Sequence, residues 1–313
     1  MAGRRALAAA LTAALAMLLA GCGPIVADEP KALTYYATFY PLYALTEALT
    51  DGVPGVTLHC LAQPQDGCLR SYALSDWDAR LLASGADAVI LGGRGLESFE
   101  SALLDWGEGG PAVTAALYNL ELYSGDPARA EGREDSHLDG PNPHLYLSAD
   151  GAKRILEAIS GALTVFDPQY GARYAANEAA AMEKLDALSR TIEDAAKALS
   201  GQRVILMNEA LVYPALDCGL EIAEWIDRES GEGYDARSLD AVLKRLDASG
   251  ARVVLIERQA PAALIAALEA SGYRVAKLDV LSTRREGEGF DAYVQALNDN
   301  AQAIVRACGE DES

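Results

Sequence analysis

The stretch DPQYGARYAANEAAAMEKLDALSRTIEDAAKALSG, residues 167–201, decides the fold of this 313-residue chain. Asp167 suits a helix N-cap and Pro168 suits the first turn, whereas Ser200-Gly201 is typical of a helix end. A helix of about 30 residues is roughly 45 Å long. We therefore predict a long rigid helix over 167–200 that joins two lobes. Apolar residues recur along it at steps of three and four, which indicates one buried face: Met182, Leu185, Leu188, Ile192, Ala195 and Leu199.

Short apolar segments alternate with helical stretches on both sides of this helix, which is typical of parallel sheets covered by helices. We predict an α/β fold of two Rossmann-like lobes, residues 33–166 and 201–313. Ligands in such folds bind beyond the carboxyl ends of the strands, so the site is expected between the lobes. The predicted strands lie within residues 34–40, 56–62, 86–93, 111–123, 203–208, 220–226, 252–257 and 274–280.

The N-terminus has the features of an export signal. A basic start, MAGRR, precedes an apolar run over residues 6–20 that is too short to span a membrane. The run ends in Leu19-Ala20-Gly21-Cys22, which resembles a bacterial lipobox; the alternative is an ordinary signal peptide with a chance cysteine. We predict a signal peptide over 1–21, a tether over 22–32 and a lipid anchor at Cys22 that holds the protein to the cell membrane.

The net charge limits the classes of partner. The chain has 46 Asp and Glu against 26 Lys and Arg, a formal net charge of −20. This balance disfavours nucleic acid, which requires a basic surface. It is compatible with the collection of cations and equally with simple solubility.

Four cysteines follow Cys22, and an even count in an exported chain suggests disulfides. Cys60 and Cys68 close a short loop and are predicted to pair with each other. Cys218 and Cys308 are then left to form the second bridge. The alternative is that Cys68 is a free thiolate that acts as a metal ligand.

The order of parts resembles the metal-binding class of ABC-transporter substrate-binding lipoproteins, the zinc and manganese receptors. The likeness covers about residues 33–307 and is carried by TFYPLY, ADAVILGGRGLESF, NPHLYLSADGAKRIL, FDPQYGARYAANEAAAMEKLDAL, VVLIE, KLDVL and YVQALNDNAQAIV. It implies a monomeric receptor that binds a divalent transition metal, with zinc expected before manganese. The receptor would deliver the metal to an ABC permease and would use no organic cofactor.

In that family four side chains, mostly histidines with an aspartate, enclose one cation. His144 in NPHLYL matches the second ligand, and Asp279 in KLDVL matches the fourth. The third falls on Asn208 in MNEAL, where Glu209 is adjacent, and the first falls on Arg70 in CLRSY. Histidine and carboxylate suit zinc and manganese, and asparagine is a weaker ligand. Arginine cannot coordinate a cation. Glu257, at the end of RVVLIE, is expected to be structural or to support the ligands.

Arg70 leaves several interpretations open. In the first, Arg70 points to solvent, and His144, Glu209 and Asp279 hold a metal whose coordination water or Cys68 completes. In the second, Arg70 replaces the metal and forms a salt bridge to Asp279. In the third, Arg70 faces an anionic organic ligand or a metal chelate. Arg70 is a plain surface residue if the match is displaced by one or two positions. The sequence contains no nucleophile–base pair, HExxH motif or phosphate loop, so no enzymatic activity is predicted.

Overall fold

The structure is a computed structural model that describes residues 32–62, 72–106, 110–124, 141–226, 233–282 and 289–309. The predicted signal peptide and tether, Cys22, Cys68 and Arg70 lie outside these residues. Within the described ranges, none of the helices combines the length and the apolar character that crossing a bilayer requires.

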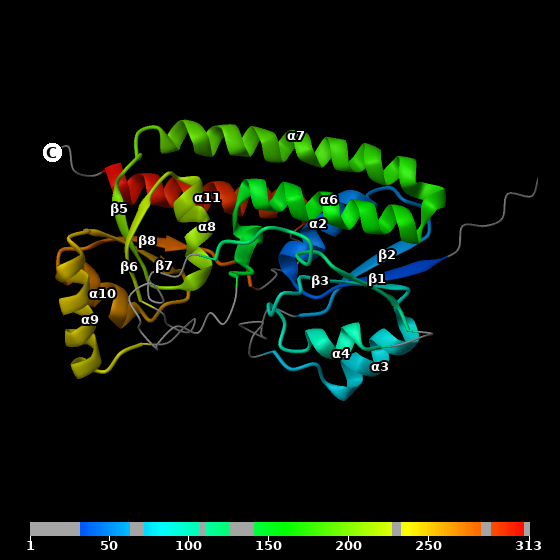
Figure 1. The fold of residues 1–313 in the computed structure, drawn as a ribbon, viewed down its shortest axis with the longest axis horizontal. Coiled ribbons are helices and arrows are strands. Elements are labelled where there is room, and N and C mark those ends of the chain that lie inside the picture. Colours follow the sequence, from blue (N-terminus) through cyan, green and yellow to red (C-terminus); the bar gives the residue numbers. More distant parts are fainter. Residues whose placement is uncertain are drawn as a thin grey trace, which may run out of the picture. The chain divides into compact units, whose positions relative to one another are not determined.

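Two four-stranded parallel sheets form the framework (Figure 1). In both sheets the second strand along the chain lies at one edge, followed by the first, third and fourth, so the two halves share one topology. This arrangement confirms the predicted α/β class. The first sheet contains β1 (Leu33–Ala37), β2 (Val56–Cys60), β3 (Ala88–Leu91) and β4 (Ala112–Ala115), and the second contains β5 (Arg203–Leu206), β6 (Glu221–Trp225), β7 (Val253–Glu257) and β8 (Arg274–Leu278).

In the described ranges, helices follow most of the strands, and three short 3-10 turns lie among them. The 3-10 turns are η1 (His144–Leu147), η2 (Pro168–Tyr170) and η3 (Glu209–Leu211). The α-helices are α2 (Tyr40–Thr50), α3 (Asp76–Gly85), α4 (Glu100–Leu104), α6 (Ala149–Phe166), α7 (Gly171–Ala196), α8 (Val212–Asp217), α9 (Ala236–Ser249), α10 (Ala262–Ala270) and α11 (Phe290–Gly309).

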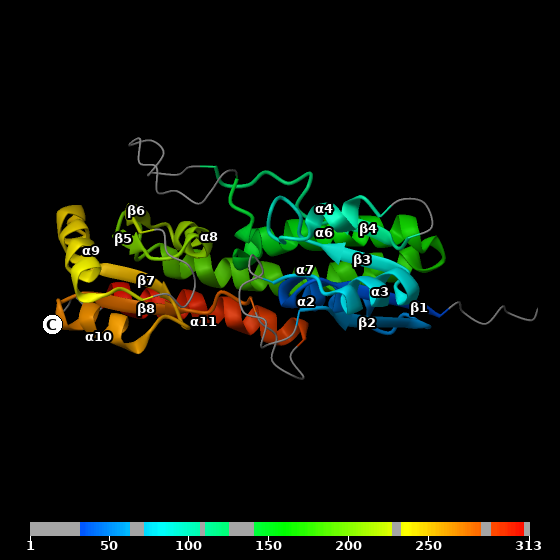
Figure 2. The same cartoon turned by 90° about the horizontal axis from the view of Figure 1, so that it is seen from below.

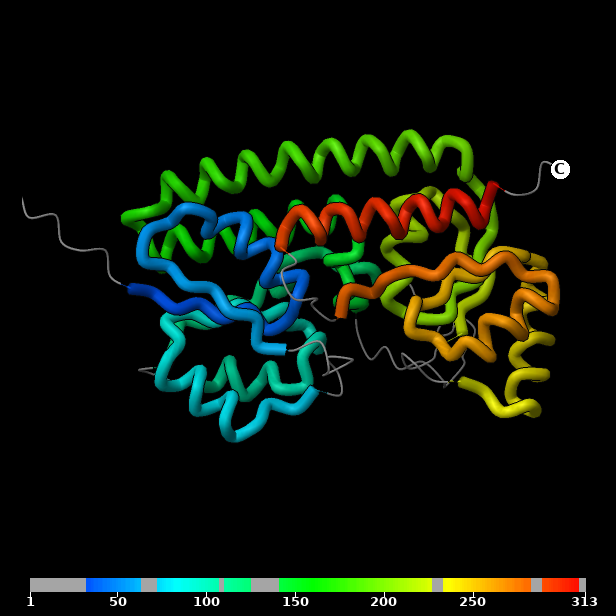
Figure 3. The backbone as a smooth tube through the Cα atoms, turned by 180° about the vertical axis from the view of Figure 1, so that it is seen from behind, coloured from blue at the N-terminus to red at the C-terminus, as the bar shows by residue number. Residues whose placement is uncertain are grey.

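Helix α7 is the long helix that the sequence predicts, and it is 26 residues long. The chain enters it through η2, so the regular helix begins at Gly171 rather than at the proline. Leu185, Leu188 and Ile192 of the predicted stripe are buried. The helix packs against α6, α2 and α11 (Figure 3), because this stripe would otherwise expose apolar surface to water.

Helix α11 connects the C-terminal residues to the first half of the chain. It contacts β8 and α8 but also α2 and α7 (Figure 2). At its first residue, the Phe290 amide donates to Glu47 Oε2 on α2 at 2.8 Å, which satisfies an amide at a helix start. A Cβ on Gly289 would clash with the same carboxylate oxygen, so a larger residue there would displace the Glu47 side chain from this contact.

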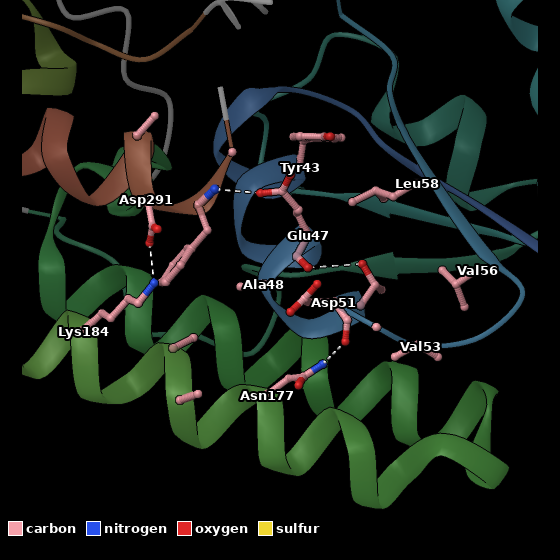
Figure 4. Close-up of a pocket in the computed structure, with 17 residues that line it drawn as sticks. Tyr43, Glu47, Ala48, Asp51, Val53, Val56, Leu58, Asn177, Lys184 and Asp291 are labelled. Atoms are coloured by element: carbon pink, nitrogen blue, oxygen red, sulfur yellow. Dashed lines mark hydrogen bonds and ion pairs between the residues drawn. The ribbon is translucent and has the colours of Figure 1, made fainter. Parts of the chain in front are cut away.

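A hollow of about 840 Å³ lies between α2, β2, α7 and the start of α11 (Figure 4). Several of its polar groups bind one another. Lys184 pairs with Asp291, and Asn177 donates to the carbonyl oxygens of Leu49 and Asp51 at the end of α2. These contacts fasten the helices together, and the residues predicted to bind metal do not line this hollow.

The predicted disulfide between Cys218 and Cys308 is not formed, and this expectation is corrected: both are buried free thiols. Burial raises the pKa of Cys218 to about 12 and also raises the pKa of Cys308. A thiolate is the species that attacks in disulfide formation, so burial holds both side chains in the unreactive form. Cys60 is also buried, and the predicted Cys60–Cys68 pairing lies outside the described residues because Cys68 does.

Asp217, at the end of α8, fastens the second half of the chain to the start of α6. It accepts hydrogen bonds from Ser148 Oγ at 3.0 Å and from the Ala149 amide at 3.2 Å. Its loss of hydration nevertheless dominates and raises its pKa from 3.8 to about 6. The folded protein therefore binds the proton more tightly than the unfolded chain does, and the Asp217 carboxylate lowers stability as the pH rises from about 4 to about 6.

We expect the substitution Asp217→Asn to raise the melting temperature at pH 8 and to leave it unchanged at pH 4. The side chain is half-buried, so the gain is about 1 kcal/mol after solvent screening, or roughly 2 °C. Thermal unfolding at both pH values measures it. Glu157→Gln, an exposed carboxylate on α6, is the control and should shift neither value. An equal gain at both pH values for Asp217→Asn would contradict the assignment.

Candidate metal centre

His144 is the first residue of η1, a turn that is held firmly on the rest of the protein. The next three residues of the turn are buried, and Tyr293 Oη of α11 donates to the carbonyl oxygen of Tyr146. The turn also lies directly on the first turn of α6, since a Cβ on Gly151 would clash with the Leu145 carbonyl oxygen. The backbone of His144 therefore has little freedom.

Glu209 approaches His144 from the other half of the chain. β5 leads into Asn208, whose side-chain oxygen accepts from the Ala210 amide at 2.9 Å and caps η3. Asn208 is 7% exposed, and its oxygen already serves the backbone. The side chain of Glu209, the residue after Asn208, points toward His144. Its Oε1 lies 3.9 Å from His144 Nε2, and both side chains are 12% exposed.

Asn142 links these two segments and determines the protonation of His144. Its Nδ2 donates to the Glu209 carbonyl oxygen at 2.8 Å, so its Oδ1 must face the histidine. Oδ1 accepts from the His144 amide and contacts His144 Nδ1, both at 2.9 Å. A carbonyl oxygen can only accept, so Nδ1 carries the proton. In the neutral imidazole, Nε2 then carries the lone pair and lies on the side of Glu209.

The backbone of Asn142 is held as firmly as its side chain. Its amide donates to the Tyr123 carbonyl oxygen at 2.8 Å, and its carbonyl oxygen accepts from Tyr213 Oη at 2.8 Å. The Tyr123 amide in turn donates to Tyr213 Oη at 3.0 Å. Asn142 is wholly buried, and burial also raises the pKa of Tyr213, which keeps that hydroxyl protonated. The sequence reasoning missed Asn142 and Tyr213; the only sequence signal for Asn142 is its place two residues before His144.

Asp279 lies at the end of β8 and is held by a different set of contacts. Asn300 of α11 bonds both its amide, at 2.7 Å, and its carbonyl oxygen, at 2.8 Å. Its Oδ1 accepts from the Leu281 amide at 2.9 Å, and its Oδ2 pairs with Arg258 Nη1 at 3.2 Å. Glu257 ends the neighbouring strand β7 and is completely buried. Its predicted supporting role stays a prediction.

His144 and Glu209 lie at a spacing that can be compared with that of two ligands on one metal ion. Two donors that each lie about 2.0–2.2 Å from a tetrahedral zinc are roughly 3.4 Å apart. The 3.9 Å between His144 Nε2 and Glu209 Oε1 is close to that spacing, and both are ligand types that zinc accepts. Asp279 does not join them: among the residues that the structure describes, no three His, Cys, Asp or Glu side chains gather closely enough to hold an ion. Arg70 and Cys68 are not among the residues that the structure describes.

Comparison with known proteins identifies the family of this chain. The family model described as zinc-uptake complex component A, periplasmic, matches residues 36–307. The chain belongs to this family. The predicted resemblance to metal-binding receptors of ABC importers is thereby confirmed. The zinc-uptake component A family is a family of substrate-binding transport proteins rather than enzymes.

Relatives of the zinc-uptake component A family align over nearly the whole chain. The high-affinity zinc uptake system protein ZnuA of Brucella abortus is 24% identical over 326 residues, which covers 93% of this chain and 96% of that protein. The zinc-binding lipoprotein AdcA of Streptococcus pneumoniae is 23% identical over 312 residues, which covers 96% of this chain and 60% of AdcA.

Solved structures share the fold of this family member. FpvC of P. aeruginosa, a substrate-binding protein in complex with Ni²⁺, has a TM-score of 0.74 at 21% identity and covers 90% of this chain and 99% of FpvC. The Zn(II)-bound ZnuA-like domain of AdcA has a TM-score of 0.73 at 21% identity, with 89% and 99% covered. At this identity the likeness establishes the fold alone.

We expect the substitution Asn142→Ala to weaken zinc binding by about 10- to 100-fold, because the residue that orients His144 is lost. It should also lower the free energy of unfolding by about 1–3 kcal/mol, since buried polar groups lose their partners. Calorimetric titration and denaturant unfolding measure the two effects. Asn177→Ala also removes amide bonds to backbone carbonyls, and this control should leave zinc binding intact. Equal zinc affinity in Asn142→Ala and the wild type would refute the orienting role.

Proposed function

We propose that this protein is an extracytoplasmic, lipid-anchored receptor of an ABC importer that binds a divalent transition metal and passes it to a permease. Zinc is the preferred cargo and manganese the second choice. One observation carries the proposal: His144 Nε2, with its lone pair set by Asn142, faces Glu209 Oε1 at 3.9 Å in a mostly buried place. Membership of a zinc-uptake family supports the choice of zinc.

The mechanism is binding and transfer, with no bond chemistry. A metal must meet deprotonated donors, and the Asn142 amide already holds His144 in the tautomer that leaves Nε2 unprotonated. Glu209 supplies a carboxylate without a change of backbone. Asp279 lies apart from this pair in the described structure and would have to approach it to act as the third protein ligand. Water or Cys68 completes the shell. The 26-residue helix α7 packs along both halves of the chain and restricts domain closure to a modest tilt.

A second candidate is a receptor of the same fold that binds an anionic organic ligand or a metal chelate through Arg70. The observation that favours it is the Arg258–Asp279 ion pair, which gives the carboxylate of a predicted metal ligand a cationic partner. With two arginines at positions expected near the cargo, an anionic group on the ligand would gain charge-assisted hydrogen bonds.

Calorimetric titration of the metal-stripped protein with zinc and with manganese separates the two candidates. If the protein is a metal receptor, it binds one zinc ion per chain. The substitution His144→Ala should then weaken zinc binding by more than about 100-fold, a larger effect than the loss of a residue that only orients a ligand. His59→Ala, an exposed histidine on β2, is the matched control and should leave the affinity unchanged.

An Arg70→His variant identifies the role of Arg70. If the wild type binds zinc tightly, the remaining ligands suffice. If only Arg70→His binds zinc, the arginine has replaced a metal ligand, and the chelate or anion receptor becomes the function. Failure of both proteins to bind zinc or manganese contradicts the proposed metal receptor.

The predicted anchor has its own test. We expect the substitution Cys22→Ser to release the protein from membranes, because the acyl chains that hold it are attached to the cysteine thiol. Fractionation of cells into membrane and soluble material measures the change. Cys60→Ser is the control for loss of a cysteine and should remain in the membrane fraction. Retention of Cys22→Ser on the membrane would show that the lipobox interpretation is wrong.

A further inference from the structure

Strand register places Arg258 beside the predicted metal ligand Asp279. β7 and β8 pair in parallel with Glu257 opposite Leu278, and the Arg258 amide donates to the Leu278 carbonyl oxygen at 2.7 Å. The residue after each strand end therefore emerges next to the other. Arg258 Nη1 lies 3.2 Å from Asp279 Oδ2.

The two partners of this ion pair differ in freedom. Asp279 is 19% exposed, and Asn300 binds its amide and its carbonyl oxygen while the Leu281 amide binds its Oδ1. Leu281 adopts a φ of 55°, a left-handed conformation that is uncommon for leucine, so this turn is specifically maintained. Arg258 is 46% exposed and lies on a long side chain that can reach solvent.

We infer that Arg258 is an internal competitor of the cargo cation for Asp279, and that it lowers the affinity of the receptor for metal. The inference rests on the metal-binding function proposed above. A guanidinium cannot be deprotonated at any physiological pH, so it shares Asp279 with a metal only by leaving it. Asp279 is held by the fold, so Arg258 is the group that moves when zinc binds, and it returns when zinc leaves.

This arrangement suits a protein that must release its cargo. In the metal-free receptor Arg258 neutralises a carboxylate that would otherwise stand uncompensated in a strongly acidic chain. During transfer, the return of the guanidinium to Asp279 offsets part of the cost of removing the metal from that ligand. Arg258 is thus a residue that sets affinity and release rather than a ligand.

The test compares zinc affinity in the wild type and in Arg258→Ala. Removal of the competing charge should tighten binding roughly three- to tenfold, as expected for a partly exposed pair. Arg258→Lys keeps the charge and should show a smaller gain. The matched control is Arg252→Ala, which removes an exposed pair with Asp247 at 2.9 Å at the opposite end of β7 and should leave the affinity unchanged.

A double-mutant cycle with Asp279→Asn shows whether Arg258 acts through Asp279. The gain from Arg258→Ala should vanish when Asp279 is already neutral. An equal gain in both backgrounds would overturn the inference, because the arginine would then act on the site as a whole. Circular dichroism confirms that each variant is folded.

Nuclear magnetic resonance supplies a readout of the movement itself. The guanidinium Nη–H signal of Arg258, assigned by its loss in Arg258→Lys, should be protected from exchange in the metal-free protein and should exchange rapidly with zinc bound. If wild type and Arg258→Ala bind zinc equally and this signal does not change, the inference is wrong while the metal receptor stands. If neither protein binds zinc, both the inference and the proposed function fail.

Discussion

The amide of Asn142 is the interaction on which the candidate site depends. One small side chain bonds the backbone and the ring of His144 and the backbone of Glu209, which are 65 positions apart in the sequence and belong to different halves of the chain. Its donor and acceptor atoms are distinct, so their partners allow only one orientation. That orientation fixes the tautomer of His144 and brings the carboxylate of Glu209 opposite its lone pair.

The surrounding structure protects this arrangement. Tyr213 and Tyr123 close a ring of hydrogen bonds around the Asn142 backbone. The turn η1 packs against α6, and Tyr293 of α11 donates a hydrogen bond to it. Helix α11, in turn, is joined to α2 through Glu47 and to β8 through Asn300. The same helix therefore supports His144 through Tyr293 and Asp279 through Asn300. A buried polar network whose members are all satisfied is rigid, so these contacts hold His144 and Asn142 in fixed positions.

The charges near the two donor sets are distributed unequally. His144 and Glu209 place a ring nitrogen and a carboxylate oxygen opposite each other, an arrangement that favours a cation between them. The Asp279 carboxylate, in contrast, already forms an ion pair with the Arg258 guanidinium. Among the described residues, two donors therefore lie together in one place, and a third is paired with a cationic side chain in another. Under the proposed function, the charge of Arg258 would weaken the hold on metal without any change in the fold.

Much of the architecture could be predicted from the sequence, because it depends on local periodicity. The apolar stripe Leu185, Leu188 and Ile192 predicts α7, and the alternation of strands and helices predicts both parallel sheets. The positions of His144, Glu209 and Asp279 followed from a resemblance of motifs, and their roles stay predictions. The Cys218–Cys308 bridge, chosen by elimination, was wrong, because the count of cysteines carries no information about burial of their thiols.

The sequence by itself determined the elements, their order and the types of side chain at the ends of the strands, since these depend on residues that are neighbours along the chain. Only the tertiary structure decided which of these side chains meet. Asn208 faces its own backbone while Glu209 faces His144, and Arg258 reaches Asp279 because β7 and β8 pair in one register. Such contacts depend on the packing of segments far apart in the sequence, and no local pattern records that packing.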